Sequence, residues 1–376
     1  MRILHLITRM DRGGSAVNTL ISATEQVRAG HDVVLAMGLS EESEMSADEF
    51  HRVEEGLNAF QAMGGVVQWL PSLKRSLGLH DWMAYREIGT LLNDQFDLVH
   101  THTSKAGVLG RLAASGRTKI VHTPHGHIFH GYFGALKTKL FIAVERWMAK
   151  KSDALIALTE AEKQDHLKLN IGKTEQWCVI PSGVDVQAIS SEVETLHQQS
   201  DHEMKWDAVS VGRLVPIKGM DRLIRAWAEV CKTKSGAKLA IIGDGEERKA
   251  LQAQAEAFGM AENIYFAGWA DPIPYLASAR CFALLSRNEG MGRAVVEAFA
   301  ASLPCVVSDV CGLSELVDES VGAVVDAERS ELVAQSLLLQ WSPNVGAAAR
   351  VRADHYSVEA MFDGLQSIYE EVCAHV

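Results

Sequence analysis

The sequence predicts an α/β protein made of two doubly wound domains that face each other across a cleft. Short apolar runs alternate with longer segments of helical period from the first residue onward, and this alternation starts again near the middle of the chain. The length supports the same prediction, because 376 residues exceed what one hydrophobic core usually organises. We therefore expect two parallel sheets of nearly equal size.

Five apolar runs define the predicted strands of the first half. Runs without apolar and polar alternation suit strands that are buried on both faces, and a helix after each strand implies a parallel sheet. The strand and helix pairs are "RILHLI" with 14–29, "DVVLA" with 47–63, "VVQWL" with 80–94, "FDLVH" with 104–114 and "KIVHT" with 134–151.

The second half repeats this organisation. It begins with "WDAVSVG" and continues through "KLAIIG", "NIYFAG", "CFALLS", "PCVVSD" and "GAVVD". Residues 186–205 are polar and lack periodicity, so we interpret them as a linker between a domain of residues 1–185 and a domain of residues 206–356. A last helix over 357–376 is free to pack back on the first domain.

Composition excludes several classes of protein. A net charge of −12 argues against a general nucleic-acid binder. No apolar run approaches the roughly 20 residues of a membrane span. Six cysteines are scattered without a CxxC pair, and no secretory leader precedes the first strand, which favours a reducing cytoplasm. We expect a cytoplasmic protein that could still lie peripherally against the inner face of a membrane.

Glycines and cations follow two of the predicted strands, where ligands of open α/β sheets bind. Gly13 and Gly14 open the first helix, so backbone amides and the positive helix end can face an anion, although a plain tight turn fits equally well. Arg213 and Lys218 share the first loop of the second half and can grip a diphosphate. A solvated basic loop is the alternative. Gly243 and Asp244 end another strand, where glycine lets the backbone approach a flat ring.

The stretch "SRNEGMGRAVVEAFAASLPCVVSD" is the most informative motif. A strand ends at Ser286, Glu289 stands in a glycine-rich loop, and the following helix carries Glu297. Both carboxylates can point to one place, while the backbone amides between them stay free. Carboxylates match the hydroxyls of ribose or hexose, and a glycine-rich helix start matches phosphate, so the motif suits a nucleotide sugar. The loop residues between the glutamates that we include are Gly290, Met291 and Gly292.

Histidines gather in "HTPHGHIFHG", which holds His122, His125, His127 and His130; His100 and His102 lie upstream. A structural zinc site is one interpretation, but proline and glycine break helical spacing here, and no cysteine or carboxylate joins the cluster. His122 is better explained as a packed residue or a strand-end hydrogen-bond partner. His127 and His130 follow on a loop, where they could meet an acceptor or only water.

Two further stretches carry open alternatives. Lys105 at a helix start could meet an acceptor phosphate or remain solvated. The predicted helix 134–151 places Leu136, Leu140, Val144 and Trp147 on one stripe, which suits a crossover helix packed on its sheet. Basic residues surround this stripe, so the helix could instead rest on anionic lipid. They are Lys137, Lys139, Arg146, Lys150 and Lys151.

In their order along the chain, these motifs resemble the retaining glycosyltransferases of the GT-B fold, specifically the family-4 type group. The resemblance rests on the "GG" loop, "HTHTSKAGVLGRLAA", "HTPHGH", "VIPSGVD", "GRLVPIKG", "GDGEER" and the two glutamates. It covers essentially the whole chain. It implies two Rossmann-like domains, the first for the acceptor and the second for the nucleotide sugar.

The resemblance also implies roles for individual residues. Gly14 would approach the donor phosphate or sugar. Arg213 and Lys218 would neutralise the diphosphate, and Glu297 would bind the ribose hydroxyls. Catalytic roles fall on Glu289, which would bind the transferred sugar, and on His125, which would accept a hydrogen bond from a sugar hydroxyl or donate one. The remaining candidates, for acceptor contact, are His102, Lys105, His127 and His130. No metal or other cofactor is implied, and the chain has no Asp-x-Asp motif.

We therefore expect a retaining transferase that moves a hexose from a nucleotide-diphosphate sugar to an acceptor hydroxyl. A UDP-sugar is favoured only by prior expectation. The expected acceptor is a surface polysaccharide, such as lipopolysaccharide, or a lipid-linked glycan. The alternatives are a sugar-nucleotide epimerase of the same fold and a non-catalytic partner protein. A dinucleotide-dependent oxidoreductase is disfavoured because no first-strand turn shows GxGxxG.

Overall fold

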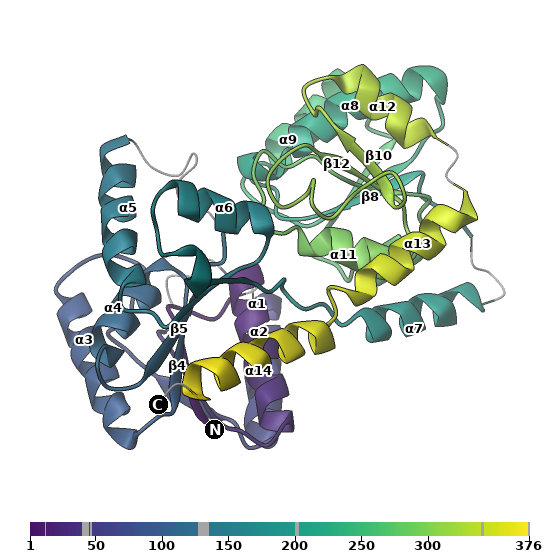
Figure 1. The fold of residues 1–376 in the computed structure, drawn as a ribbon. Coiled ribbons are helices and arrows are strands. Elements are labelled where there is room, and N and C mark those ends of the chain that lie inside the picture. Colours follow the sequence, from purple (N-terminus) through teal and green to yellow (C-terminus); the bar gives the residue numbers. More distant parts are fainter. Residues whose placement is uncertain are drawn as a thin grey trace. The chain divides into compact units, whose positions relative to one another are not determined.

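The computed structural model describes residues 1–11, 13–39, 45, 47–126, 135–199, 203–339 and 342–374. The chain divides into two compact units, one of Met1–Gly183 with Val358–Val376 and one of Val184–Ser357. Each unit has a parallel sheet with helices on both faces (Figure 1). The prediction of two doubly wound α/β domains is confirmed.

The sheet of the first unit has the strand order β3-β2-β1-β4-β5-β6-β7. Its central strands are buried on both faces, which explains their unbroken apolar runs. The chain order reverses beside β1, between β2 and β4, and such a reversal is where parallel sheets bind ligands. The strands are β1 (Arg2–Ile7), β2 (Asp32–Met37), β3 (Val66–Trp69), β4 (Leu98–His102), β5 (Lys119–Thr123), β6 (Ala154–Ala157) and β7 (Trp177–Val179).

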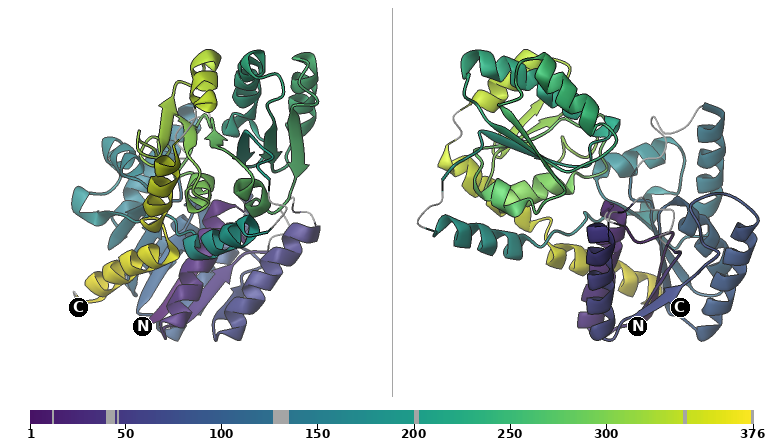
Figure 2. Two further views of the ribbon diagram at one scale, coloured as in Figure 1. Left: turned by 90° about the vertical axis from the view of Figure 1, so that its right-hand side faces the viewer. Right: turned by 180° about the vertical axis from the view of Figure 1, so that it is seen from behind.

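Helices cover both faces of this sheet, as Figure 2 shows from two further sides. α3 and α4 share one core with β1 and β4, and α1 and α2 share another with β1 and β2. The C-terminal helix α14 packs against α1, where the Ser22 hydroxyl lies 3.7 Å from the sulfur of Met361. The helices are α1 (Gly14–Arg28), α2 (Ala47–Ala62), α3 (His80–Leu91), α4 (Ser104–Ala114), α5 (Ala135–Ala149), α6 (Glu160–Lys168) and α14 (Val358–Ala374).

The sheet of the second unit has the order β10-β9-β8-β11-β12-β13. Its main core lies under α8, whose Leu223, Trp227 and Val230 are buried at helical spacing. The strands are β8 (Ala208–Val211), β9 (Leu239–Ile242), β10 (Ile264–Gly268), β11 (Phe282–Leu284), β12 (Cys305–Ser308) and β13 (Gly322–Val325). The helices are α7 (Val186–His197), α8 (Met220–Thr233), α9 (Arg248–Ala257), α10 (Ile273–Ala277), α11 (Arg293–Ala300), α12 (Ser330–Leu338) and α13 (Pro343–Asp354).

The predicted linker 186–205 is wrong in its first part, because α7 occupies residues 186–197 and belongs to the second unit. The Asp185 side chain caps this helix by accepting a hydrogen bond from the Ala188 amide at 3.0 Å. Ser190 donates a hydrogen bond to the carbonyl of Ala300 at 2.9 Å, and Val193 is buried. The helix was missed because its few apolar residues stand among polar ones, and only tertiary packing reveals their common face.

Candidate functional site

In the second unit, the loops after β8 and β11 bring two predicted residues together. Lys218 ends a 3-10 turn of Pro216–Lys218, and its Nζ lies 2.6 Å from Oε2 of Glu289. The Ser286 hydroxyl donates a hydrogen bond to the same oxygen at 3.2 Å. Both charged side chains are mostly shielded from solvent, with 22% and 14% of their surfaces exposed. The two residues, 71 positions apart, therefore form one ion pair at the carboxyl end of the sheet.

Glycines allow the loops of this unit to approach each other closely. Gly243 has φ 134°, and a Cβ there would lie 2.0 Å from the carbonyl oxygen of Gly212. A Cβ at Gly312 would lie 2.4 Å from the carbonyl oxygen of Gly290. Gly292, with φ 80°, immediately precedes α11 in the left-handed conformation. The backbone after β8, β9, β11 and β12 is therefore packed into one compact edge.

Glu297 lies on α11, as predicted, and Arg293 at the start of the same helix is a neighbour that sequence reasoning did not single out. Burial lowers the pKa of the Arg293 guanidinium, while the negative charge of Glu297 opposes this shift. Met291, between the two predicted glycines, is buried. The available signal for Arg293 was its position directly after Gly292, at the first turn of the helix.

Two other predicted residues of this unit differ in their surroundings. Arg213 is exposed, and no hydrogen bond or ion pair of its side chain occurs among the described residues. Asp244 instead pairs with Arg248, whose Nη1 lies 2.6 Å from Oδ2. Arg248 was not predicted, although it is the first basic residue after the "GDG" turn. The carboxylate of Asp244 thus orders its own loop.

In the first unit, Gly13 and Gly14 stand at the start of α1, as predicted. The Gly13 amide donates a hydrogen bond to Oδ1 of Asp11 at 2.7 Å, and the other Asp11 oxygen pairs with Arg9 at 2.8 Å. The glycine turn therefore already has an anionic partner from its own chain. The prediction that the Gly13 amide is open to a donor phosphate is contradicted in this geometry.

A row of histidines lies at the carboxyl ends of β1, β4 and β5. His102 has one ring nitrogen, Nε2, 2.9 Å from Nδ1 of His5, and the other, Nδ1, 2.9 Å from Nε2 of His125. His102 is only 1% exposed. The prediction that His102 contacts an acceptor is therefore wrong, because the ring is buried and both nitrogens already have partners.

Two neighbouring histidines are also held inside the unit. His100 lies 2.5 Å from the Tyr369 hydroxyl and 2.7 Å from the Thr123 hydroxyl. Nδ1 of His122 lies 2.9 Å from the Thr101 hydroxyl, which confirms His122 as a strand-end hydrogen-bond partner. His127 and His130 lie outside the described residues.

Burial keeps these imidazoles uncharged. It lowers the pKa of His5 to about 4 and that of His125 to about 3. It also lowers the pKa of His102 well below the ordinary value, and the surrounding histidines add to this effect. All of them are neutral at physiological pH.

Three of these histidines lie close enough together to be considered as metal ligands. One nitrogen from each of His5, His100 and His102 lies within 4.8 Å of the others. Each nitrogen of these rings, however, already has a hydrogen-bond partner in the protein, and no cysteine or carboxylate completes the set among the described residues. The donor set fits a hydrogen-bonded network better than a metal site.

Lys105 is engaged within its own unit. Its Nζ forms an ion pair with Oδ1 of Asp81 at 2.5 Å and donates a hydrogen bond to the carbonyl of Ser76. The side chain is 13% exposed. This geometry contradicts the prediction of a lysine that is free for an acceptor phosphate, because a carboxylate already balances its charge.

Known proteins resemble both halves of this arrangement. Residues 12–188 match the model of Glycosyltransferase Family 4, and residues 192–341 match Glycosyl transferases group 1. An Escherichia coli relative, UDP-Gal:alpha-D-GlcNAc-diphosphoundecaprenol alpha-1,3-galactosyltransferase, is 30% identical over 269 residues, which cover 66% of this chain and 67% of the relative. The chain belongs to the family-4 glycosyltransferases. The predicted family and the predicted enzyme class are thereby confirmed.

Two more proteins extend the comparison for this glycosyltransferase. The D-inositol 3-phosphate glycosyltransferase of Segniliparus rotundus is 29% identical over 326 residues, which cover 80% of this chain and 66% of that one. The crystal structure of Anabaena HepE in complex with UDP-glucose matches with a TM-score of 0.77 and covers 99% of this chain and 100% of its own. At 20% identity, this second likeness concerns the fold.

The glycosyltransferase exposes the apolar stripe of α5 instead of packing it on the sheet. Leu136, Leu140 and Trp147 are 84%, 66% and 53% exposed. The inner side of the helix carries Glu145, which forms a buried ion pair with Arg111 at 2.8 Å. The interpretation of α5 as a crossover helix that packs through this stripe is therefore wrong, because the sequence period defined the stripe but not the side that faces the sheet.

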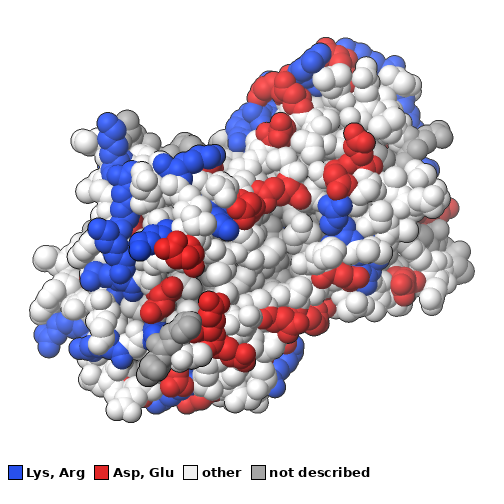
Figure 3. Space-filling view, viewed as in Figure 1, with Lys and Arg blue, Asp and Glu red and all other residues white. Residues whose placement is uncertain are grey.

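Segment 74–86, which leads into α3, is a second exposed surface of the same kind. α4 packs against both α3 and α5, so the two surfaces flank one helix. Figure 3 shows Lys and Arg in a column over α5. The exposed apolar residues of the segment are Leu77, Leu79, Trp82, Met83 and Tyr85, and the exposed basic ones are Lys74, Arg75 and Arg86. We call α5 and segment 74–86 together the apolar and basic face.

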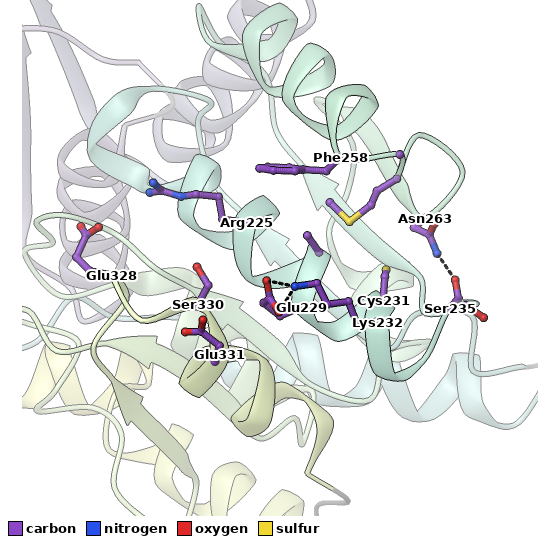
Figure 4. A pocket seen from close by; sticks show the side chains of 13 residues that line it. Arg225, Glu229, Cys231, Lys232, Ser235, Phe258, Asn263, Glu328, Ser330 and Glu331 are labelled. Carbon is purple, nitrogen blue, oxygen red and sulfur yellow. Dashed lines mark hydrogen bonds and ion pairs between the residues drawn. The ribbon is translucent and has the colours of Figure 1, made fainter.

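A groove of about 700 Å³ in the second unit is a different feature, shown in Figure 4. Arg225, Glu229 and Lys232 of α8 line it, with Phe258 after α9 and Glu331 on α12. The groove lies toward the amino ends of the strands, because α8 and α9 end beside it and β10 starts there. Parallel sheets bind ligands at the opposite edge, so this groove is not the candidate site. No described helix is long and apolar enough to cross a membrane.

Proposed function

We propose that this glycosyltransferase transfers a hexose from a UDP-sugar to a hydroxyl of a lipid-linked glycan, with retention of anomeric configuration, during the synthesis of a surface polysaccharide such as lipopolysaccharide. The observation that carries the donor half is the Lys218 and Glu289 ion pair, at 2.6 Å, among glycine-rich loops at the carboxyl edge of the second sheet. A cation and a carboxylate held together there suit a diphosphate joined to a sugar.

The donor residues divide by chemistry. Lys218 and the exposed Arg213 neutralise the diphosphate, and the amides from Gly290 to Gly292 at the start of α11 complete the phosphate site. Glu297 accepts hydrogen bonds from the ribose hydroxyls, and Glu289 accepts them from the transferred sugar. Gly243 and Asp244 shape the edge against the nucleobase.

Bond cleavage explains why cations dominate this site. Breaking the anomeric bond leaves positive charge on the sugar and negative charge on the diphosphate, and preorganised donors stabilise the latter. Retention then follows from attack by the acceptor hydroxyl on the same face, with a diphosphate oxygen taking the proton. His125 contacts a hydroxyl of the transferring sugar, and Gly14 approaches the donor. The reaction needs no metal or other cofactor.

The acceptor proposal rests on two supports. The Escherichia coli relative is named for a diphosphoundecaprenol-linked acceptor. The apolar and basic face suits an anionic membrane, because exposed leucines and tryptophan can enter the lipid while lysines stay at the headgroups. We infer peripheral contact at the cytoplasmic side of the membrane, where a lipid-linked glycan is within reach.

A panel of nucleotide sugars tests the donor. The purified protein is incubated with each one, with and without a lipid-linked N-acetylhexosamine acceptor, and products are followed by mass analysis and by NMR of the new anomeric centre. One UDP-hexose should be consumed to form an α-linked product only when acceptor is present. Consumption without acceptor to give an isomeric nucleotide sugar would indicate an epimerase instead. Binding without turnover of any donor would indicate a non-catalytic protein.

Vesicle sedimentation tests the membrane contact. The wild-type protein should bind vesicles that contain anionic lipid, and salt should weaken the binding. The double variant Leu140→Ser with Trp147→Ala should bind less. Trp69→Ala removes an equally exposed tryptophan from β3 of the same unit and should bind like wild type. Equal binding to neutral and anionic vesicles would contradict the proposal.

A further inference from the structure

A continuous chain of hydrogen bonds runs from α1 to His125. Oε1 of Gln26 lies 2.7 Å from Nε2 of His5. Nδ1 of His5 lies 2.9 Å from Nε2 of His102, and Nδ1 of His102 lies 2.9 Å from Nε2 of His125. Gln26 and His5 are fully buried, and His102 is 1% exposed, so no solvent interrupts the chain.

The direction of every proton in this chain follows from its first member. The amide oxygen of Gln26 has no hydrogen, so Nε2 of His5 must carry the proton between them. A neutral imidazole carries a single proton, so Nδ1 of His5 can only accept one from Nε2 of His102. The same alternation makes Nδ1 of His102 the acceptor of the proton on Nε2 of His125.

The alternation requires that each ring stays neutral. Burial lowers the pKa of every histidine in the chain, to about 4 for His5 and about 3 for His125. A second proton would also turn one acceptor nitrogen into a donor that faces another donor. The geometry and the burial thus favour the same arrangement.

We propose that Gln26, His5 and His102 are positioning residues that hold His125 in its Nε2-protonated tautomer, which leaves Nδ1 with a lone pair for a hydroxyl of the transferring sugar. This inference rests on the proposed contact between His125 and the sugar. It decides which partner donates: the hydroxyl donates and the imidazole accepts. Among the described residues, Nδ1 of His125 has no protein partner.

The backbone supports a fixed ring orientation. His125 has φ 59°, a left-handed conformation that non-glycine residues adopt rarely. The next amide, that of Gly126, donates a hydrogen bond to Oε1 of Glu162 at 2.8 Å. The backbone therefore places the ring, and the bond to His102 sets its rotation and its tautomer.

NMR of the full-length protein labelled with 15N-histidine tests the tautomer directly. Two-bond and three-bond proton-nitrogen correlations distinguish a proton on Nε2 from a proton on Nδ1. Wild-type His125, assigned by its absence from the spectrum of His125→Gln, should show the Nε2 pattern at neutral pH. An Nδ1 pattern would overturn the proposal, whatever the enzyme's activity.

Kinetics of three variants test the positioning role. His102→Leu removes the acceptor and should lower kcat by roughly 10–100-fold, as loss of an outer-shell partner typically does. His102→Asn supplies an amide oxygen near the position of Nδ1 and should recover most of the rate. His122→Leu is the matched control: it removes an equally buried strand-end histidine that bonds Thr101 and should leave kcat within about threefold. Equal losses in His102→Leu and His122→Leu would contradict positioning.

Gln26→Leu covers the case in which His102→Leu fails to fold. It removes the terminal acceptor at the far end of the chain and should give His125 a mixed tautomer spectrum. An unchanged spectrum in a folded Gln26→Leu would overturn the proposal. If His125→Gln instead retains full transfer, the proposed sugar contact is wrong, although the tautomer result still stands.

Discussion

The first unit keeps the polar residues at its strand ends buried and neutral, whereas the second unit keeps charged residues close to its surface. His5 and His102 are almost without exposure, and their rings exchange hydrogen bonds. Lys218 and Glu289 are partly exposed and meet as ions. Buried neutral rings fix direction, and partly exposed charges respond to a charged ligand. The difference matches a division between orienting a sugar and holding a diphosphate.

Buried and exposed ion pairs give the largest expected contrast. Glu145→Ala leaves the Arg111 guanidinium buried without its carboxylate and should lower the free energy of unfolding by about 3–5 kcal/mol. Glu229→Ala breaks the pair with Lys232 on the surface of the second unit and should cost less than about 1 kcal/mol. Denaturant unfolding of both variants measures the difference. Equal costs would show that burial does not separate the two pairs.

Removing the proposed diphosphate cation should reduce catalysis without unfolding the protein. Lys218→Ala should lower kcat/KM for the donor by about 10²–10³-fold, the usual effect of losing one preorganised donor to a developing anion. Lys232→Ala removes a lysine that is paired with Glu229 on the same unit and should leave turnover unchanged. Steady-state kinetics with the donor identified in the panel provide the measurement. A loss of less than about tenfold in Lys218→Ala would remove the lysine from the proposed mechanism.

Acid should destabilise the first unit before the second. His5 has a folded pKa of about 4 against an ordinary 6.5, so its stabilisation is complete above about pH 6.5 and disappears as the pH falls toward about 4. Each such histidine gives a slope of about 1.4 kcal/mol per pH unit in that window. Hydrogen exchange, resolved by peptide, should show the first unit opening earlier.

The second unit provides the control for acid. Its described residues include no buried histidine. The pKa of Asp318 is lowered to about 2 by hydrogen bonds from Ser320 and Arg352, so its contribution is lost only as the pH falls from about 3.8 toward 2. Simultaneous opening of both units at about pH 5 would contradict the contrast.

The smallest expected effect concerns the glycine turns of the second unit. Gly243→Ala places a Cβ 2.0 Å from the Gly212 carbonyl oxygen at φ 134°, and the strain should cost about 1–3 kcal/mol. Gly236→Ala is the control, because a Cβ there meets nothing within 4 Å. Thermal unfolding should separate the two variants. Equal melting temperatures would show that the loop yields without cost.

Local sequence patterns predict much of this protein. Unbroken apolar runs indicate the parallel strands, and the residues just after them include the Lys218 loop and both glutamates of the second unit. Strand ends share one edge of a parallel sheet whatever the details of packing, so this prediction needs only the strand order.

Other predictions failed where the answer depended on distant contacts. His102 looked available, but β1 and β5 supply His5 and His125 to both of its nitrogens. Lys105 looked free, but Asp81 from α3 pairs with it. Gln26 and Arg293 carried no motif at all. Their importance depends on which side chains the fold brings within hydrogen-bond distance.

Residues close together in the chain are enough to specify the alternation of strands and helices, the glycine turns and the family. Which polar groups are buried and which apolar ones are exposed depends instead on tertiary packing. The helical period groups Leu136, Leu140 and Trp147 on one side of α5, but the Arg111 and Glu145 pair turns another side inward. Burial depends on what packs against a residue, and that partner is distant in sequence.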